Sequence, residues 1–354
     1  MSGSFTAAAA KGPPEDSATA GAVELLGMIS GSWMSQAICV AAELRIADLL
    51  AGGPECVVDL ARSSQCHAGS LNRLMRALAS LGICSELPDG FFELTSVGRL
   101  LRQGQPNSLW CSALWWVRHQ SQTWENLLYS IRTGKSARTL VTGLAGYGHV
   151  ESDPRVAAVF NGAMVELTRF VASEVSRLHD FSMSASVVDV GGGYGELLAV
   201  ILGDHPQLRG TLFDLPHAVD GATLRFAESG LTDRCHVIAG DFFESVPVGA
   251  DRYLLKSVLH NWDDEHAGLL LANCRRAVSQ KGQLVVVERL LPVRIGSSPF
   301  ERSAARADLN MLLSCGGRER TEDELLALLS SSGFRVTRIV STAFDFSLVE
   351  ASCV

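Results

Sequence analysis

The chain has little charge and no excess of basic residues. Lys and Arg total 30 of its 354 residues against 38 Asp and Glu, so the formal net charge is −8 at pH 7. Proteins that bind nucleic acid or anionic membranes usually present a basic face. We therefore expect neither kind of partner. With 19 % charged and 47 % hydrophobic residues, the composition is that of a globular protein.

The cysteines show no metal-binding or disulfide pattern. There are nine, an odd number, and none forms a Cys-x-x-Cys pair. This usage favours reduced thiols in the cytoplasm and predicts no metal site. The N-terminus also lacks a basic segment followed by a long apolar run, since the alanines at 7–10 are interrupted by Lys11 and Pro13. We expect no signal peptide or membrane span there, and a disordered tail over residues 1–17.

A glycine cluster is the most informative stretch. Residues 187–195 read Val-Val-Asp-Val-Gly-Gly-Gly-Tyr-Gly, and a helical pattern follows over 196–202. This order predicts a strand, a tight turn and a helix start, where backbone N–H groups attract an anionic ligand. Gly191, Gly193 and Gly195 follow Gly-x-Gly-x-Gly, whereas a dinucleotide fingerprint would need glycine at Glu196. Alone, the glycines indicate only a turn of some α/β protein.

Two acidic residues make a nucleoside ligand the better interpretation. Asp189 precedes the glycines, and Asp214 ends the next apolar run at 210–213, where a carboxylate can accept both hydroxyls of a ribose. This combination resembles the S-adenosylmethionine site of class I methyltransferases.

The second half of the chain alternates strands and helices. Strands are expected at 187–190, 210–213, 236–239, 253–257 and 284–288, with helices at 196–202, 217–229 and 265–279. Such alternation predicts a parallel sheet covered on both faces. A capping box, Thr321 with Glu324, begins a helix, and two strands at 336–341 and 344–351 must then pair antiparallel. This α/β arrangement, a Rossmann-like sheet with an antiparallel closing hairpin, is that of class I methyltransferases, and we assign it to residues 181–354.

Residues 18–105 predict a mostly helical winged-helix domain. Helical spacing over 19–50, with a second helix at 41–51, is followed by helices at 57–63 and 68–81 and a hairpin at 83–94. Arg73 and Arg76 in the fourth helix raise the alternative of DNA binding. Between residues 41 and 100, however, there are five basic against seven acidic residues, so dimerisation is the favoured role.

Residues 106–180 are expected to form a helical connector and substrate cap with unusual aromatic content. Trp115 and Trp116 cannot both face one way on a helix, so one of them is a candidate pocket residue and the other core. A long helix over 153–178 carries Phe160 and Met164 at helical spacing. These four residues are candidates to line a pocket for a flat acceptor.

Polar and aromatic residues follow several strand ends, where α/β sheets bind ligands. Asp241 and Phe242 follow the third strand. Asp241 is a candidate to hydrogen-bond the amino group of adenine and Phe242 to pack on its ring, although a plain turn is an equal interpretation. His260 lies just past the fourth strand, which makes it a candidate base, and Trp262 is a candidate cover for the adenine. Asp263 or Asp264 is expected to cap the next helix.

Two carboxylates are candidate partners for His260. Glu288 closes a run of three valines, where burial is costly unless the charge has a partner. Glu319 precedes the capping box, and one interpretation is that it also reaches His260. The alternative is that it remains a solvated charge beside Arg318 and Arg320.

Taken together, these pieces are similar to the plant caffeic-acid type and bacterial natural-product O-methyltransferases, from about residue 20 to the end. The resemblance implies S-adenosyl-L-methionine as cofactor, His260 as general base flanked by Glu288 and Glu319, and a homodimer built from the N-terminal region. It implies that the cofactor contacts Asp189, Gly191, Gly193, Asp214, Leu215, Asp241, Phe242, Lys256 and Trp262. Expected acceptor contacts are Trp115, Trp116, Phe160, Met164, Asn261, Asn310 and Met311.

The chain departs from the family at Asn261, where the residue after the base histidine is usually acidic. The expected reaction is methylation of a hydroxyl on a small aromatic or polyketide-like natural product. The alternatives are a C- or N-methyltransferase of the same fold, in which His260 binds a metal, and a ligand-sensing DNA-binding regulator.

Overall fold

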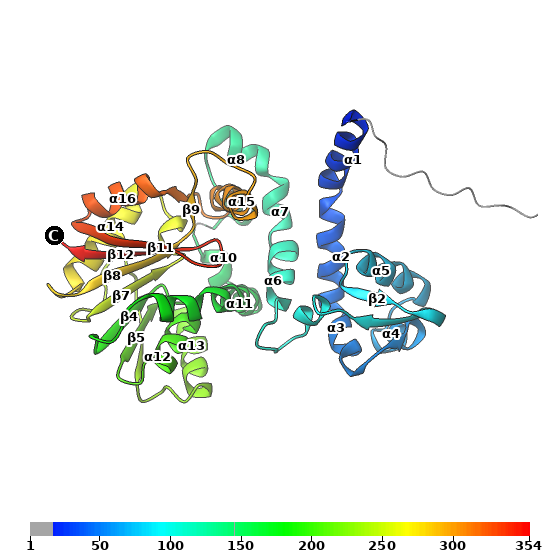
Figure 1. The fold of residues 1–354 in the computed structure, drawn as a ribbon, viewed down its shortest axis with the longest axis horizontal. Helices are drawn as coiled ribbons and strands as arrows, with labels where there is room; N and C mark the ends of the chain where they lie inside the picture. The colour runs from blue at the N-terminus through cyan, green and yellow to red at the C-terminus, as the bar shows by residue number, and fades with distance from the viewer. Residues whose placement is uncertain (1–16, 145) are drawn as a thin grey trace, which may run out of the picture. The chain divides into compact units, whose positions relative to one another are not determined.

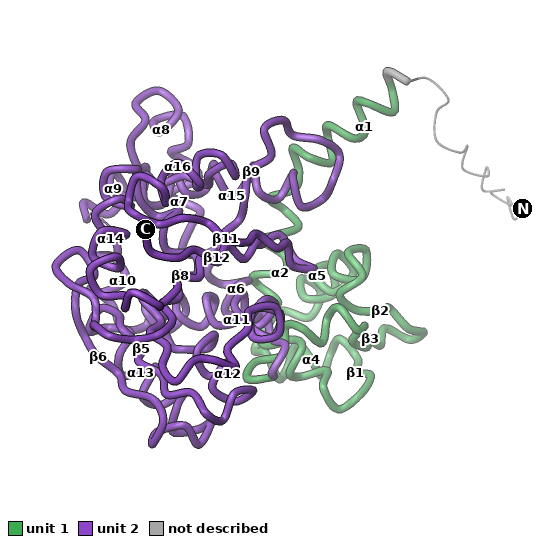
Figure 2. Tube along the Cα trace, turned by 60° about the vertical axis from the view of Figure 1, so that its left-hand side comes forward, with its two compact units in different colours: residues 1–105 green, residues 106–354 purple. Residues whose placement is uncertain are grey.

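The computed structural model describes residues 17–144 and 146–354. The predicted disordered tail therefore lies, apart from Ser17, outside the described residues. The chain divides into two compact units, residues 1–105 and 106–354, which Figure 2 colours separately.

The first unit is a helical domain with a small sheet. Its helices are α1 (Ser17–Ile29), α2 (Gly31–Glu43), α3 (Ile46–Leu49), α4 (Val57–Ser63) and α5 (Ala68–Ser80). The strands β1 (Glu55–Cys56), β2 (Cys84–Glu86) and β3 (Phe91–Leu94) form an antiparallel sheet of order β1-β3-β2. Leu71, Met75 and Leu78 of α5 are buried, as is Phe92 of β3, so the hairpin packs its inner face in the core of this unit.

Two features of this unit differ from the sequence prediction. The helix predicted over 41–51 is interrupted, because Arg45 adopts left-handed backbone angles with φ of 55° and the chain restarts as α3. This bend brings Ile46, Ala47 and Leu50 into the core. Strand β1 was not predicted, since two residues are too few to show alternation.

The second unit contains the predicted parallel sheet and its antiparallel closing hairpin. Seven strands run in the order β11-β12-β8-β7-β4-β5-β6 (Figure 1). They are β4 (Ser186–Val190), β5 (Arg209–Asp214), β6 (Cys235–Ala239), β7 (Arg252–Lys256), β8 (Gln283–Glu288), β11 (Phe334–Ser341) and β12 (Ser347–Cys353). The first five are parallel, and β12 pairs antiparallel with both β8 and β11. The carboxyl ends of β4 to β8 therefore share one edge.

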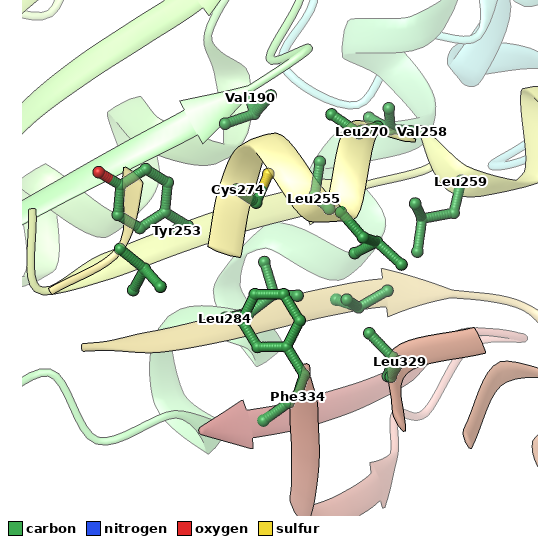
Figure 3. Close-up of a cluster of buried hydrophobic side chains, with 14 of the residues drawn as sticks. Val190, Tyr253, Leu255, Val258, Leu259, Leu270, Cys274, Leu284, Leu329 and Phe334 are labelled. Atoms are coloured by element: carbon green, nitrogen blue, oxygen red, sulfur yellow. The ribbon is translucent and has the colours of Figure 1, made fainter. Parts of the chain in front are cut away.

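Alternate residues of the central strands pack on opposite faces of the sheet. Tyr253, Leu255, Leu284 and Val286 contact α14 (Asp264–Ala277) and α16 (Glu322–Ser331), in the cluster drawn in Figure 3. Their neighbours in sequence, Leu254, Val285 and Val287, pack on the other face with α11 (Pro154–Leu178), α12 (Glu196–Asp204) and α13 (Pro216–Glu228). Burial on both faces explains the continuous apolar runs in the sequence.

Short helices and α15 (Pro299–Ser314) form the cap beside this sheet. The helices are α6 (Trp110–Leu114), α7 (Ser121–Glu125), α8 (Leu127–Thr133), α9 (Ala137–Thr142) and α10 (Gly148–Glu151), with a π-helical turn at Trp115–His119. The buried Glu166 carboxylate of α11 accepts hydrogen bonds from the backbone N–H groups of Cys111 and Ser112. It thereby fixes the start of α6 to the long helix that lines the site.

Candidate active site

The turn after β4 has the backbone geometry that only glycine provides easily. Gly191, Gly193 and Gly195 have φ of 71°, 59° and 77°, and α12 begins at the next residue. A Cβ on Gly191 would lie 2.9 Å from the side chain of Val258, and one on Gly192 would lie 2.6 Å from Asp189 Oδ2. Protein side chains therefore pack closely against one side of the glycine turn. Its other side is left free for a ligand.

Two carboxylates stand at this turn, Asp189 buried and Asp214 partly buried. Asp214 Oδ2 accepts from Gly193 N at 2.6 Å, and Oδ1 accepts from Leu215 N at 2.6 Å, which fixes the carboxylate at the edge of the sheet. Asp189 is 1 % exposed, and its Oδ2 has no hydrogen-bond partner among the described residues. Burial, together with the charge of Asp214, raises the pKa of Asp189 to about 7.

A cavity of about 410 Å³ opens over the turn. Its lining includes Asp189, Gly191, Gly193, Asp214, Leu215, Asp241, Phe242, Lys256 and Trp262, all of which were predicted to hold the cofactor. Phe160, Asn161 and Met164 of α11 also line it, together with Tyr147 and Asn261. The predicted cofactor residues and two of the predicted acceptor residues of α11 therefore border one cavity.

Lys256 ends β7 and is held at the bottom of this cavity. Its Nζ donates to Thr168 Oγ1 at 3.1 Å and lies 5.3 Å from the centre of the Phe346 ring. Burial lowers the pKa of Lys256 to about 8, so the amine stays mainly protonated at neutral pH.

His260 follows β7 on a 3₁₀ turn, Leu259–Asn261, and meets both predicted carboxylates. Its Nδ1 is 3.0 Å from Glu319 Oε1 and 3.5 Å from Glu288 Oε2. Glu319 is 1 % exposed, so it is not the solvated charge that was the alternative. Among the described residues, no hydrogen bond involves Nε2 of the ring.

Glu288 also holds the backbone turn that carries His260. Ser257 takes left-handed angles with φ of 56°, and Glu288 Oε1 accepts from the N–H groups of Val258 and Leu259 at 3.0 and 2.9 Å. Glu288 therefore fixes the turn that carries His260, whereas the closer partner of the imidazole is Glu319.

The segment before the capping box brings Glu319 to the histidine. Arg318 N donates to His260 O at 2.9 Å, and a Cβ on Gly317 would lie 2.1 Å from the same oxygen. The buried Arg320 donates to the carbonyls of Leu259 and Trp262, both at 2.9 Å. A short parallel pairing of β10 (Arg320–Thr321) with β9 (Leu290–Leu291) completes the attachment.

The two carboxylates of this cluster raise the basicity of the histidine. Burial alone lowers the pKa of His260, but the carboxylates of Glu319 and Glu288 outweigh it, so that the pKa lies above its usual value. Burial in turn raises the pKa of Glu288.

Several predicted residues lie away from the cavity. Trp115 is buried behind Phe160, with ring centroids 4.9 Å apart, and Trp116 is 38 % exposed. Neither tryptophan lines the cavity, and nor do Asn310 and Met311, which are buried on α15. His260, Glu288 and Glu319 border a smaller adjoining hollow instead.

Sequence reasoning missed Tyr147, Glu151 and His217, which also line the cavity. Tyr147 and Glu151 lie at the two ends of the short helix α10, and His217 lies in the first turn of α13. No local pattern distinguishes such residues, because long-range packing of the cap brings them there. Asp263 accepts from His266 N and so caps α14, and the predicted capping box at Thr321 is present.

The residues fit S-adenosylmethionine. The glycine turn leaves room where side chains would block it, and two backbone N–H groups fix the Asp214 carboxylate at the end of β5. Trp262 Nε1 and Asp189 Oδ2 are buried without a partner among the described residues. Acidic groups facing this end complement a ligand that carries amino and sulfonium cations.

Comparisons with known proteins agree with this site. Residues 124–335 match the model of an O-methyltransferase domain, and residues 26–104 match that of an O-methyltransferase dimerisation domain. The phenazine O-methyltransferase PhzM of Lysobacter antibioticus is 41 % identical over 92 % of this chain and 95 % of its own length. The mitomycin biosynthesis 6-O-methyltransferase of Streptomyces lavendulae is 36 % identical over 92 % and 93 %.

A solved structure adds a bound cofactor. It is the O-methyltransferase NcsB1 from neocarzinostatin biosynthesis, in complex with S-adenosylmethionine and 2-hydroxy-5-methyl naphthoic acid. It is 32 % identical, with a TM-score of 0.75 over 90 % of this chain and 96 % of that one. The predicted family, fold class, cofactor and enzyme class are thereby confirmed, and the chain belongs to the family of S-adenosylmethionine-dependent O-methyltransferases.

Proposed function

We propose that the protein methylates a hydroxyl of a small aromatic natural product, with His260 as the general base. The observation that carries this proposal is the contact between His260 Nδ1 and Glu319 Oε1 at 3.0 Å, which holds the proton on Nδ1 and leaves Nε2 basic. His260 immediately precedes Asn261, a residue of the cavity wall.

The chemistry divides between the cofactor and the protein. S-adenosylmethionine supplies an electrophilic methyl group on a sulfonium. His260 accepts the proton of the acceptor hydroxyl. Because histidine has a reference pKa of about 6.5 and a phenol about 10, the base does not ionise the phenol beforehand, and proton loss accompanies attack. Glu319 stabilises the imidazolium that forms, as the acid of a hydrolase triad does.

The cap supports an aromatic acceptor. Phe160 and Met164 present an apolar wall to the cavity, and Trp115 supports Phe160 from behind. Holding a flat ring against this wall fixes its hydroxyl relative to the methyl donor, which supplies much of the rate in bimolecular transfers.

One observation favours a second candidate function. Ligand atoms of His260, Glu288 and Glu319 lie within 4.8 Å of one another, a spacing that a metal ion would accept. A metal-assisted C- or N-methyltransferase would use these residues as ligands. Against this, Glu288 Oε1 already accepts two backbone N–H bonds.

We further propose a cytoplasmic homodimer formed through the first unit, with neither nucleic acid nor membrane as a partner. All nine cysteines are free thiols, which suits a reducing compartment. The stretch Thr19–Glu43 is long and apolar enough to span a membrane by composition, and its side chains are largely exposed. Leu26, Ile29 and Trp33 are 63 %, 67 % and 76 % exposed. An exposed apolar surface of this kind is normally buried against a partner. A second copy of the chain would bury it, which is consistent with the matched dimerisation domain.

Removing the proposed ribose contact tests the donor site. Asp214→Ala should weaken binding of S-adenosylhomocysteine by roughly 1.5–3 kcal/mol, because it deletes hydrogen bonds to a charged group. Isothermal titration calorimetry measures this binding, with Asp220→Ala on the following helix α13 as a control outside the cavity. Equal affinity of the Asp214 variant and the wild type would remove Asp214 from the site.

The role of His260 is tested by product analysis with labelled S-adenosylmethionine on a panel of phenols. His260→Ala should lower turnover by about 10²–10⁴-fold while binding of S-adenosylhomocysteine is retained. Its rate should recover partly at high pH, where the acceptor ionises without a base. If chelation abolishes wild-type activity and a divalent or ferric ion restores it, the metal-assisted alternative replaces the general base.

Sedimentation velocity tests the proposed dimer. Leu26→Asp should convert a dimer of two 37.9 kDa chains into monomers, because a two-fold interface would bury two like charges. Val97→Asp is the matched control, since Val97 is an exposed apolar residue of the same unit, 52 % accessible and outside α1 and α2. A Leu26 variant with the wild-type mass would contradict this interface.

A further inference from the structure

Glu196 places a carboxylate at a point of the cavity where it would oppose an anionic group of a ligand. It is the first residue of α12, it lines the cavity, and it is 5 % exposed. The N–H groups of residues 196–198 precede the first helical hydrogen bond of α12, which runs from Ala199 N to Gly195 O at 2.8 Å. Such N–H groups favour an anion, and a glutamate at the helix start competes for that position.

Two arginines hold the Glu196 carboxylate instead. Its Oε1 accepts from Arg169 Nε of α11 at 3.1 Å, and its Oε2 accepts from Arg225 Nε of α13 at 2.8 Å. Each guanidinium has a second anchor, because Arg169 donates to Pro106 O at 2.9 Å and Arg225 donates to Ser229 Oγ. Neither arginine lines the cavity. Both carboxylate oxygens are thereby engaged with neighbouring helices, which leaves the first turn of α12 for a ligand.

A second observation indicates a charged part of the ligand at this turn. Asp189 Oδ2 is buried without a partner among the described residues, and a Cβ on Gly192 would lie 2.6 Å from it. An ammonium group would satisfy this oxygen. S-adenosylmethionine carries an ammonium and a carboxylate on one carbon, so an ammonium near Asp189 brings the carboxylate to the same turn. Among the described residues that line the cavity, Lys256 is the one lysine or arginine, and its Nζ already donates to Thr168.

We propose that Arg169 and Arg225 are positioning residues for the methyl donor, because they hold the Glu196 carboxylate away from the start of α12. The N–H groups of that first turn then bind the carboxylate of S-adenosylmethionine. With one arginine removed, the Glu196 carboxylate turns toward the N–H groups of its own helix and repels the ligand's carboxylate. The arginines therefore act through Glu196, and a neutral side chain at that position makes them dispensable for donor binding.

Binding of two ligands to the full chain separates this role from a structural one. S-adenosylhomocysteine carries the amino-acid portion, whereas 5′-methylthioadenosine lacks it and keeps the adenosine. By isothermal titration calorimetry, Arg169→Met should weaken binding of S-adenosylhomocysteine by about 10-fold and leave that of 5′-methylthioadenosine unchanged. Arg225→Met should do the same. Adding Glu196→Gln to Arg169→Met should restore most of the lost affinity, because the competing charge is gone.

Arg177→Met is the matched control, because the Arg177 side chain lies on the same helix α11 and is 69 % exposed. It should keep the wild-type affinity for both ligands. Unchanged binding of S-adenosylhomocysteine in Arg169→Met would overturn the proposal and leave Lys256 to hold the carboxylate. A loss for both ligands that Glu196→Gln does not relieve would also overturn it, because the arginines would then only stabilise the fold.

Glu196→Gln alone decides the matter if the arginine variants do not fold. The proposal predicts that this variant binds S-adenosylhomocysteine at least as tightly as the wild type, because a neutral amide does not repel the ligand's carboxylate. Weaker binding in Glu196→Gln would mean that the carboxylate itself serves the ligand, which contradicts the proposal.

Discussion

The attachment of residues 316–320 to the turn after β7 is the contact on which the candidate chemistry depends. The His260 carbonyl accepts from Arg318, Gly317 permits that approach, and Arg320 binds the carbonyls on either side. Two segments some sixty residues apart are thereby fixed together, and the Glu319 carboxylate arrives at the imidazole already oriented. Burying two carboxylates near one histidine is costly unless hydrogen bonds hold the arrangement, and these backbone contacts provide them.

The cavity is organised by charge as well as by shape. Its acidic end meets the glycine turn, where helix-start N–H groups and Asp214 are fixed by short hydrogen bonds. Phe160 and Met164 add an apolar surface from α11.

The sequence predicts those parts that local chemistry decides. Buried parallel strands appear as apolar runs, the glycine turn needs positive φ, and the Thr321 capping box marks its helix. The residues at the carboxyl ends of the strands could be predicted to line the cavity, because parallel strands end at one edge of the sheet. What depends on distant packing could not be predicted: the left-handed backbone of Arg45, which of the two glutamates lies closer to the His260 imidazole, and the placement of Tyr147 in the cavity wall. No spacing in the chain indicates which loop a cap helix will meet.

The central claim is that Glu319 sets the basicity of His260, and the pH dependence of kcat/KM tests it most directly. A protonated histidine cannot act as base, so activity falls on the acid side of its pKa, which burial lowers and the carboxylates raise to a net higher value. Glu319→Gln should therefore move the acid limb to lower pH by about 1–3 units, with a lower maximal rate. Glu288→Gln, the matched control at 3.5 Å, should move it less. An acid limb that stays in place in Glu319→Gln would contradict the account.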